Sequence, residues 1–388
     1  MRVAIITESC PPDVNGVAHS VARVAEHLLA RGHRPLVVAP APASGTRAVT
    51  GRLGYPVVRV PSLPLPGYRA VRLGLFSRGL ADVLLGYAPD VVHLAGPFLL
   101  GARGGAVAGR LGLPVVAVFQ TDVPAYARAY RLGVGEAAAW RRLRTVHNGA
   151  ARTLAPSRAC ASALVAHGIE RVWLWPRGVD TVRFDPARRS ERLRRALAPG
   201  GELIVGFVGR LAVEKRVHLL APLCRRPGVR VVVVGDGPLR QRLQRVLTGA
   251  VFLGERHGEQ LARIYARLDL FVHTGPYETF GQTVQEALAS GVPVVAPAAG
   301  GPLDLVTPGH TGLLVPPDDA HATAEAVAAL AADRQRLHRY AEAARASVSR
   351  RTWAAVGDDL LGHYAAVVSP PVLRSPVQRT ASAPVVGG

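Results

Sequence analysis

Two glutamates that stand eight positions apart are the strongest candidates for chemistry in this sequence. Glu278 is expected in the loop after a strand, and Glu286 about one turn into a helix that begins near Gly281. Carboxylates so placed can accept hydrogen bonds from the hydroxyl groups of one ligand, while the free N–H groups around Phe280–Thr283 face an anion. Hydroxyl acceptors beside a phosphate site are what a nucleotide-sugar requires. Glutamates at this spacing are common on solvent-facing helices, so the spacing alone is weak support.

Two cations follow an expected strand over Glu202–Val208 and form the second candidate group. In the string VGFVGRLAVEKRV, Arg210 and Lys215 come after Gly209, at the carboxyl end of that strand. Open α/β sheets bind ligands at this end, and two cations there can clamp a diphosphate and stabilise its charge as a leaving group. A solvated basic loop is the alternative in an arginine-rich chain. Lys215 argues against it, because it is the only lysine among 47 basic residues.

Polar residues also follow two expected strands in the first half of the chain. Asp13 and Gly16 stand between the first strand and the first helix, where a glycine lets the backbone approach a phosphate. Gln120 and Asp122 end a later strand, and Tyr126 offers a ring face and a hydroxyl to a sugar. Each group has a structural alternative: a tight turn around Gly16 and a helix stripe packed in the core at Tyr126.

The sequence lacks the motifs of several common catalytic sites. No GxGxxG follows the first strand, which disfavours a nicotinamide cofactor. There is no P-loop, GxSxG or HExxH motif, and no Asp-x-Asp pair to chelate a metal diphosphate. We therefore expect no metal and no cofactor besides a nucleotide-sugar donor, with its diphosphate held by Arg210, Lys215 and backbone donors.

Short Val-rich strands alternate with Ala-, Leu- and Arg-rich helical segments along the chain, the pattern of layered α/β domains. The pattern breaks near Arg177–Arg189 and then restarts, which predicts two Rossmann-like, doubly wound parallel-sheet domains facing each other across a cleft. We expect an acceptor domain over 1–180 and a nucleotide-sugar-binding domain over 181–351. A helix over 352–368 is expected to pack back on the N-terminal domain, and 369–388 to form a disordered tail.

The 388 residues carry 47 Lys and Arg against 27 Asp and Glu, a formal net charge of +20. This balance favours polyanionic partners such as nucleotide phosphates, nucleic acid or an anionic membrane surface. Coding bias explains part of this charge, since every basic residue except Lys215 is arginine.

A nucleic-acid-binding protein is the alternative function from another class of protein. Aromatic residues make up only 5%, the arginines are spread along the chain and no reading motif is present, so we expect no nucleic-acid partner.

Cysteine usage and hydropathy indicate a cytoplasmic protein. The three distant cysteines are interpreted as reduced thiols, and the N-terminal MRVAIITES turns polar too early for a signal peptide. No uncharged apolar run approaches the ~20 residues of a spanning helix. The basic segment Arg141–Arg144 is a candidate to lie on anionic lipid at the inner face of the plasma membrane, with a solvated helix face as the alternative.

Several motifs together resemble glycosyltransferase family 4, whose members are retaining transferases of the GT-B fold. The motifs are GRLAVEK, VVVVGDGP, the Glu278–Glu286 segment with ETFG, and ALASGVPVVAPAAGGPLDLV, and the resemblance runs from Met1 to about Val367. More narrowly, ITESCPPDVNGVAHSV, PDVVHLAGPFLLG, VAVFQTDVPAYA and WPRGVDTVRF look like the actinobacterial GDP-mannose-dependent α-mannosyltransferases that act on glycolipid acceptors at the cytoplasmic membrane face.

The resemblance implies a role for each candidate residue. Glu278 would bind hydroxyls of the transferred sugar and Glu286 the nucleotide ribose, while Arg210 and Lys215 would hold the diphosphate. Gln120 occupies a position that many members fill with histidine, and a glutamine can hydrogen-bond but cannot carry a proton. The remaining residues are expected near the donor phosphates (Gly16, Phe280, Gly281 and Gln282) or near the sugar and acceptor (Asp13, Asp122 and Tyr126).

The sequence thus predicts a metal-independent hexosyltransferase that moves α-mannose from GDP-mannose to a glycolipid or other glycosyl acceptor with retention. No obvious nucleophile for double displacement is present, so front-face attack within an ion pair is favoured. A family member that uses a UDP-sugar and a soluble acceptor remains the enzymatic alternative.

Overall fold

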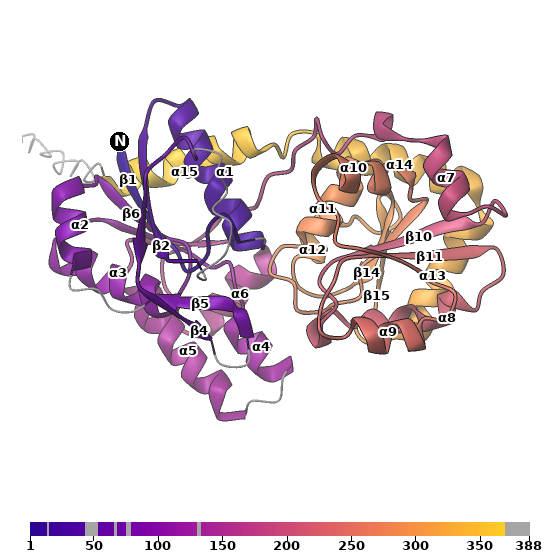
Figure 1. Ribbon diagram of the computed structural model, residues 1–388, viewed down its shortest axis with the longest axis horizontal. Coiled ribbons are helices and arrows are strands. Elements are labelled where there is room, and N and C mark those ends of the chain that lie inside the picture. Colours follow the sequence, from indigo (N-terminus) through magenta and orange to yellow (C-terminus); the bar gives the residue numbers. More distant parts are fainter. Residues whose placement is uncertain (14, 43–52, 66–67, 75–78, 130–132, 369–388) are drawn as a thin grey trace, which may run out of the picture.

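A computed structural model describes residues 1–13, 15–42, 53–65, 68–74, 79–129 and 133–368. Two α/β domains lie side by side along the long axis of the molecule (Figure 1), each built on its own parallel sheet. The two parallel sheets confirm the expected α/β class. The expected tail over 369–388 lies outside the described residues.

The N-terminal sheet has seven strands in the order β3-β2-β1-β6-β7-β8-β9, and every paired strand runs parallel to its neighbour. The strands are β1 (Arg2–Ile6), β2 (Arg34–Pro40), β3 (Val57–Val60), β6 (Val91–Leu94), β7 (Val115–Val118), β8 (Arg152–Ala155) and β9 (Val172–Leu174). The central strands are continuous Val- and Ile-rich runs because helices cover both faces of the sheet. A separate antiparallel hairpin consists of β4 (Ser62–Leu65) and β5 (Tyr68–Gly74).

The C-terminal sheet has six parallel strands in the order β12-β11-β10-β13-β14-β15. The strands are β10 (Leu203–Val208), β11 (Val229–Val234), β12 (Val251–Gly254), β13 (Leu270–Val272), β14 (Val294–Pro297) and β15 (Gly312–Val315). In each sheet the order of strands reverses beside the first strand, at β1/β6 and at β10/β13. Such a reversal leaves a crevice at the carboxyl ends of the strands, where α/β proteins bind ligands.

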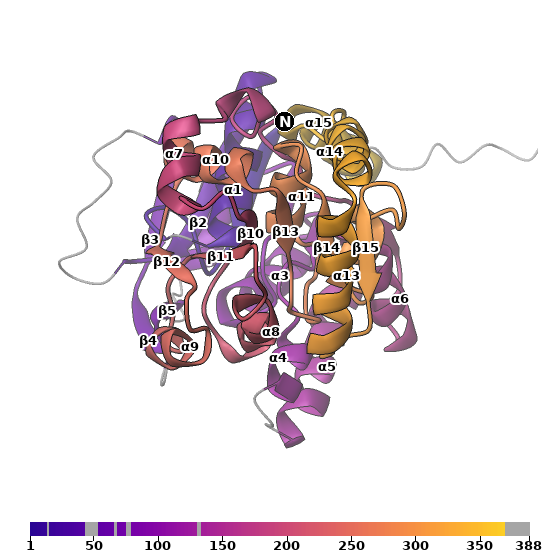
Figure 2. The same ribbon diagram turned by 90° about the vertical axis from the view of Figure 1, so that its right-hand side faces the viewer.

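Helices cover both faces of each sheet. The N-terminal domain contains α1 (Gly16–Ala30), α2 (Gly79–Tyr87), α3 (Leu99–Arg110), α4 (Val123–Ala129), α5 (Gly133–Asn148) and α6 (Arg158–Ala166). The C-terminal domain contains α7 (Glu191–Leu197), α8 (Ala221–Cys224), α9 (Arg240–Val246), α10 (Gly258–Arg267), α11 (Gln282–Ala289), α12 (Pro302–Leu305), α13 (Ala320–Ala332) and α14 (Arg334–Val348). Figure 2 shows α10, α11 and α14 on one side of the C-terminal sheet and α8, α9 and α13 on the other, matching its two hydrophobic clusters.

The helical pattern of the sequence over Ala320–Ala346 predicts a single helix, and this prediction is wrong. The chain forms two helices there, α13 and α14, because Asp333 lies between them and its Oδ1 accepts a hydrogen bond from the backbone N–H of Arg336 at 2.8 Å. This contact is a helix N-cap, and it begins α14 in a new direction.

The last helix, α15 (Trp353–Val368), leaves the C-terminal domain and packs on the N-terminal one (Figure 1). Leu360 and Tyr364 enter the N-terminal core, and the Trp175 indole N–H donates to the Val356 carbonyl at 2.9 Å. The chain therefore crosses between the domains twice. The two crossings run alongside each other, with the Val179 N–H donating to the Arg351 carbonyl at 2.8 Å.

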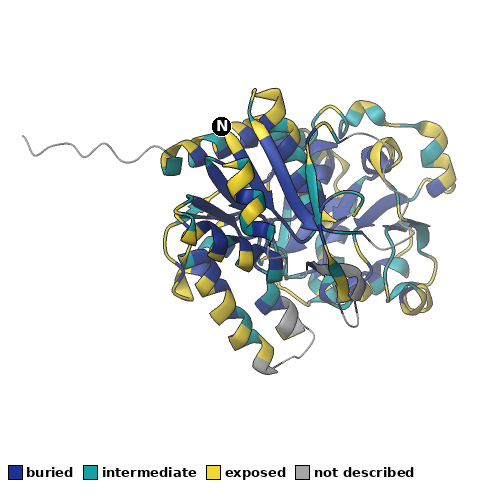
Figure 3. Cartoon of the chain, turned by 60° about the vertical axis from the view of Figure 1, so that its left-hand side comes forward, coloured by how far each residue is buried: buried dark blue, intermediate teal, exposed yellow. Residues whose placement is uncertain are grey.

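Burial follows the layered design. Figure 3 shows the strands of the N-terminal sheet as the most buried part of that domain, with exposed residues on the outer faces of its helices. Burial of apolar side chains on both sheet faces is the main stabilising contribution. The rigid sheets thus hold their strand ends in fixed positions.

Candidate active site

The carboxyl ends of the two sheets meet where the domains touch. Thr279, in the loop between β13 and α11, donates from its hydroxyl to the Gln120 carbonyl at 3.4 Å, and the Cys160 thiol donates to the Thr279 carbonyl at 3.3 Å. A third link joins Arg158 Nε to Asp304 Oδ1 at 2.9 Å. The loop that carries Glu278 is therefore placed against the strand ends of the N-terminal domain.

Glu278 forms an ion pair with Lys215 through its Oε1. The same oxygen lies 3.9 Å from Nε2 of His273. Burial alone would raise the pKa of the Glu278 carboxyl, but the charge and hydrogen bond of Lys215, with smaller contributions from His273 and Arg177, hold it below its usual value. Glu278 is therefore kept as a carboxylate, the form that accepts hydrogen bonds from hydroxyls.

Glycines fix the backbone around Glu278. Gly300 has a left-handed φ of +61°, and a Cβ there would lie 2.4 Å from the Glu278 carbonyl oxygen, so no larger residue fits. The N–H of Gly301 donates to that same carbonyl at 2.8 Å. The two glycines of the PAAGG string thus pack against the Glu278 carbonyl and fix the backbone of its loop.

The two predicted cations lie on one segment after β10 but in different surroundings. Lys215 ends a short 3₁₀ helix over Val213–Lys215, and its carbonyl accepts a hydrogen bond from the Thr274 hydroxyl at 2.6 Å. This contact ties the β10 loop to the β13 loop. Arg210 has an exposed side chain. Both lie at the carboxyl edge of the C-terminal sheet, where the sequence predicts a diphosphate site.

The predicted anion-binding backbone is the start of α11. Gly281 is its N-cap with φ of 93°, a left-handed conformation that suits glycine, and Phe280 before it is buried in the C-terminal core. The side-chain amide of Gln282 donates to the Gly178 carbonyl at 3.2 Å. The first turn of this helix therefore begins beside the crossing segment that connects the domains.

Glu286 lies one turn further along α11 and is buried. Burial raises the pKa of its carboxyl to about 7, partly offset by hydrogen bonds with Tyr265 and Gln282 and by the charge of Arg183. Glu278 and Glu286 thus face opposite electrostatic surroundings, one beside a lysine and the other in an apolar helix interface. The spacing in the sequence does not reveal this difference.

Arg177 is a site residue that the motif analysis does not identify. It stands in the first crossing segment, is only 8% exposed, and donates from Nη1 to the Gly16 carbonyl at 3.1 Å and from Nη2 to Gln120 Oε1 at 2.9 Å. The Arg177 carbonyl accepts from the side-chain amide of Gln285 on α11 at 3.1 Å. One arginine therefore joins the first βα turn, the end of β7 and the donor-side helix. The only sequence feature that points to Arg177 is its position where the alternation of strands and helices breaks.

Gln120 and Gly16 are brought together through that arginine. Gln120 is buried, with its side-chain N–H₂ donating to the Ala95 carbonyl at 3.3 Å and its Oε1 accepting from Arg177. A Cβ at Gly16 would lie 3.0 Å from Arg177 Nη1, so glycine leaves room for the guanidinium. Both residues lie at the carboxyl edge of the N-terminal sheet.

Asp13 and Asp122 each make a local contact. Asp13 accepts a hydrogen bond from the Ser9 hydroxyl at 2.7 Å in the turn before α1, and its side chain is exposed. Asp122 Oδ1 accepts from the Ala125 N–H at 2.9 Å and caps α4, while burial raises the pKa of its carboxyl. Tyr126 falls within α4, but its side chain lies outside the described part of the chain.

Glu8 is a second residue that the motif analysis misses. It follows β1, and its Oε1 accepts from the backbone N–H groups of Leu100 and Gly101 at 2.9 and 3.0 Å, which caps α3 from another element. Burial raises the pKa of this carboxyl to about 7. The strand ends of the N-terminal domain therefore hold a buried acid beside the Ala95–Gly96 turn, where a Cβ on Gly96 would lie 2.8 Å from Glu8 Oε2.

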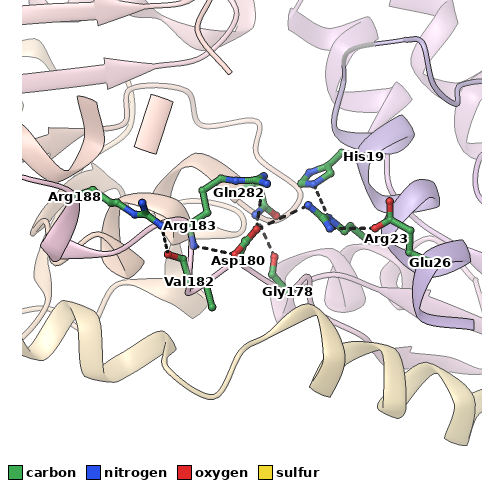
Figure 4. A network of polar contacts seen from close by, with 9 residues as sticks. All are labelled: His19, Arg23, Glu26, Gly178, Asp180, Val182, Arg183, Arg188 and Gln282. Atoms are coloured by element: carbon green, nitrogen blue, oxygen red, sulfur yellow. Dashed lines mark hydrogen bonds and ion pairs between the residues drawn. The ribbon is translucent and has the colours of Figure 1, made fainter. Parts of the chain in front are cut away.

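A polar network surrounds the crossing segment (Figure 4). Asp180 Oδ2 lies 4.0 Å from Arg23 of α1 and 3.6 Å from Arg183, and Gln282 reaches Gly178 from the other domain. Within α1, Arg23 Nε donates to His19 Nε2 at 3.2 Å. The network connects α1, the crossing segment and α11.

A pocket of about 540 Å³ lies elsewhere, at the amino edge of the C-terminal sheet before β13. Two of its arginines are paired with acids that also line it: Arg194 with Asp269 at 2.7 Å and Arg267 with Glu191 at 3.0 Å. Since parallel sheets bind ligands at the opposite edge, we place the active site at the domain junction and not in this pocket.

The described residues contain neither a metal-binding cluster nor a membrane-spanning helix. In that part of the chain, no group of three or more His, Cys, Asp or Glu side chains is arranged to hold a metal ion. No helix in the same ranges is both long enough and apolar enough to cross a membrane.

The comparisons with known proteins extend over both domains. The model of Glycosyltransferase Family 4 matches residues 14–183, and that of Glycosyl transferases group 1 matches residues 189–347. A GDP-mannose-dependent alpha-mannosyltransferase of Mycobacterium tuberculosis is 52% identical, over 95% of this chain and 97% of the relative. The enzyme of the same name from Corynebacterium glutamicum is 45% identical, over 95% and 90% respectively. The crystal structure of Anabaena HepE in complex with UDP superimposes with a TM-score of 0.75 at 22% identity, over 94% of this chain and all of that one, which shows the fold.

Proposed function

Because the chain belongs to glycosyltransferase family 4 and has its GT-B fold, we propose that it transfers α-mannose from GDP-mannose, with retention, to a glycolipid acceptor. The observation that carries the choice of donor is the identity of at least 45%, along nearly the whole chain, to enzymes named for GDP-mannose. That the chain is a glycosyltransferase follows from the family itself.

The donor is proposed to bind at the carboxyl edge of the C-terminal sheet. Arg210 and Lys215 hold the diphosphate together with the backbone of Phe280, Gly281 and Gln282 at the start of α11. When the bond between sugar and phosphate breaks, the diphosphate takes the electron pair, and the two cations stabilise that negative charge. The same cations supply the charge that a metal ion would otherwise supply, so the transfer is proposed to be metal-independent.

Glu278 and Glu286 are proposed to hold the two hydroxyl-bearing parts of the donor. Glu278, kept ionised by Lys215, accepts hydrogen bonds from hydroxyls of the mannose. Glu286 does the same for the ribose. Both contacts orient the anomeric carbon toward the N-terminal domain, where the acceptor hydroxyl attacks from the face that the diphosphate leaves.

The acceptor is proposed to bind at the strand ends of the N-terminal domain, near Asp13, Gln120, Asp122 and Tyr126. Gln120 is held by Arg177 and has no proton to exchange, so it serves as a hydrogen-bonding group and not as a general acid. Gly16 lets the turn before α1 come close to the diphosphate from this side.

We also propose that the protein is a peripheral protein of the inner membrane face. Arg141, Arg142 and Arg144 on α5 are exposed, while Leu143 between them is buried in the domain. Each exposed arginine near an anionic bilayer contributes roughly 1 kcal/mol of attraction. A glycolipid acceptor then reaches the active site from the surface on which the enzyme lies.

The experiment is a donor and acceptor screen with the purified protein. We expect GDP, and not UDP, to raise the melting temperature, and GDP-mannose to be consumed in the presence of a bacterial lipid extract with formation of an α-linked product. Thermal stabilisation by UDP with turnover of a UDP-sugar on a soluble acceptor would reject the donor and the acceptor proposed here. Vesicles with and without anionic lipid test the membrane proposal: cosedimentation should need the anionic lipid and should weaken in an Arg141→Glu, Arg144→Glu variant.

A further inference from the structure

His273 is a buried histidine beside the proposed sugar-binding carboxylate. It follows β13 directly and is 3% exposed. Neither ring nitrogen makes a hydrogen bond of regular geometry. A contact with the Gly275 backbone slightly raises the pKa of the ring. Burying a polar group without such a partner costs free energy, so an apolar residue would fill this position at less cost.

The other buried histidines in the described part of the chain have regular partners. His93 Nδ1 lies 2.6 Å from the Tyr364 hydroxyl, and His147 Nδ1 lies 3.2 Å from Thr153 Oγ1. Neither of these pairs involves a charged side chain. His273 differs because its nearest ionised neighbours are the two residues on which donor binding is proposed to depend, Glu278 and Lys215.

His273 lies close to Glu278 but does not hydrogen-bond to it. Its Nε2 lies 3.9 Å from Glu278 Oε1, too far for a hydrogen bond, and the same oxygen is engaged by the Lys215 ammonium. Burial lowers the pKa of the His273 ring to about 4, so the ring is neutral at physiological pH and carries one N–H. With that proton on Nε2, a shift of the carboxylate by about 1 Å brings the N–H within the ~2.7–3.2 Å of a hydrogen bond.

Donor binding creates the need for such a partner. In the structure one cation, Lys215, is paired with Glu278, while the proposed function requires that cation at the diphosphate. If Lys215 turned to the diphosphate with no replacement, Glu278 would be a buried carboxylate without its main partner, which is strongly unfavourable. It would then protonate or turn away, and in either case lose the ability to hold sugar hydroxyls.

We propose that His273 is a positioning residue that donates a hydrogen bond from Nε2 to Glu278 when Lys215 moves to the donor diphosphate. The inference rests on the proposed function of Glu278 and Lys215. No proton is transferred, because the neutral ring donates its N–H and keeps it. His273 thereby holds Glu278 ionised and oriented toward the sugar in the donor complex.

The test compares His273→Leu, which removes the N–H, with His273→Gln, which replaces Nε2–H by an amide N–H. His147→Leu, another buried histidine changed in the same way but away from charged groups, is the control. Binding of GDP and of GDP-mannose is measured by calorimetry, together with kcat. We expect His273→Leu to lower kcat about 10- to 100-fold, as for loss of one hydrogen bond to a charged group. Its affinity for GDP should also fall several-fold, because the diphosphate of GDP draws Lys215 away from Glu278 too, and the additional affinity for GDP-mannose should be lost.

The His273→Gln variant distinguishes a hydrogen-bonding role of His273 from a role in packing alone. We expect His273→Gln to recover much of the kcat that His273→Leu loses, and His147→Leu to keep wild-type kinetics. A folded His273→Leu with wild-type kcat, or a folded His273→Gln that is impaired as much as His273→Leu, would overturn the inference.

A spectroscopic readout does not depend on the leucine variant. In ¹⁵N-histidine-labelled wild-type protein, an exchange-protected imidazole N–H signal should appear on binding of GDP-mannose or of GDP, because both carry the diphosphate that draws Lys215 away, and it should be missing in His273→Gln. Its absence in the wild-type complex would reject the inference. Failure of the proposed function gives a different result: wild-type protein would not turn over GDP-mannose at all, and the same comparison would then be made with the nucleotide-sugar that it does use.

Discussion

Arg177 and Gln120 are joined by a hydrogen bond of 2.9 Å between Nη2 and Oε1, although 57 positions separate them in the chain. The arginine belongs to the segment that crosses between the domains, and the glutamine ends a strand of the N-terminal sheet. Their contact fixes the side chain of Gln120 just after β7. It also places a buried positive charge near Glu278, whose pKa it helps to lower.

This contact should be detectable as an energetic coupling. We expect Arg177→Ala and Gln120→Ala each to destabilise the protein, and the double variant to cost about 1–3 kcal/mol less than the sum of the two, because each single change leaves the other polar group buried without its partner. Urea unfolding and kcat/KM of the four proteins measure the coupling. Additivity within about 0.5 kcal/mol would show that the two side chains act independently.

The two glutamates should fail in different ways. We expect Glu278→Gln to lower kcat by about 100-fold, because the sugar is mispositioned while charge develops on the diphosphate. Glu286→Gln should mainly raise the KM for the donor by about tenfold, because ribose contacts are equal in the ground state and the transition state. Steady-state kinetics check this, with Glu259→Gln on the exposed face of α10 as the control. Near wild-type kcat/KM in both variants would remove the pair from the site.

Lys215 should matter far more than an exposed arginine. We expect Lys215→Ala to lower kcat on the order of 100- to 1000-fold, since it removes a positive charge that stabilises the leaving group. Arg242→Ala on the exposed face of α9 should change the transition-state free energy by less than about 1 kcal/mol. Lys215→Arg should also be impaired, because a planar guanidinium does not replace a compact ammonium. Equal kinetics of folded Lys215→Ala and Arg242→Ala would contradict the assignment.

Activity should persist in EDTA. The expectation comes from Arg210 and Lys215, which are proposed to neutralise the diphosphate without a metal ion. Initial rates before and after extensive chelation, measured in the same buffer, make the comparison. Loss of activity on chelation, with recovery on addition of Mg²⁺ or Mn²⁺, would refute this proposal.

Glu8 should make stability depend on pH. Burial raises the pKa of its carboxyl from 4.5 to about 7, so between these values the folded protein binds a proton that the unfolded chain does not, and its contribution to the free energy of unfolding falls as pH rises. Glu8→Gln keeps an acceptor oxygen for the cap of α3 and removes the titration. Chemical unfolding at about pH 5 and about pH 8 should show a smaller loss of stability in Glu8→Gln than in wild type. An unchanged difference would mean that Glu8 does not titrate in this range. Glu286, whose pKa is also about 7, remains in both proteins.

The sequence predicts the α/β class because alternating Val-rich strands and helical segments are local features. It also predicts which segment carries Glu278 and Glu286, since the string from Gly275 to Gly301 combines a strand end, a helix start and two supporting glycines. The break in α13 and α14 escaped prediction because Ala-rich segments continue the helical pattern on both sides of Asp333. A single capping carboxylate decides that boundary.

Contacts between distant segments could not be predicted in the same way. Glu8 and Arg177 lie in strings that carry the family resemblance, but no motif assigns a role to them or to His273, because their roles depend on which strand ends the fold brings together. The pairing of Lys215 with Glu278 is of this kind too, since the two residues belong to different loops at the reversal between β10 and β13. Burial and charge at that point determine which carboxylate is ionised.

Helix α15 makes the N-terminal domain discontinuous along the gene. Its Tyr364 and Leu360 complete a core formed mainly by strands from the first half of the chain, and Asp358 pairs with His27 at 3.0 Å. A hybrid enzyme that joins the first half of this protein to the second half of a relative would therefore give that core a foreign helix. Exchange of donor specificity between relatives requires two junctions, one in each crossing segment, so that α15 stays with the parent that supplies β1 to β9.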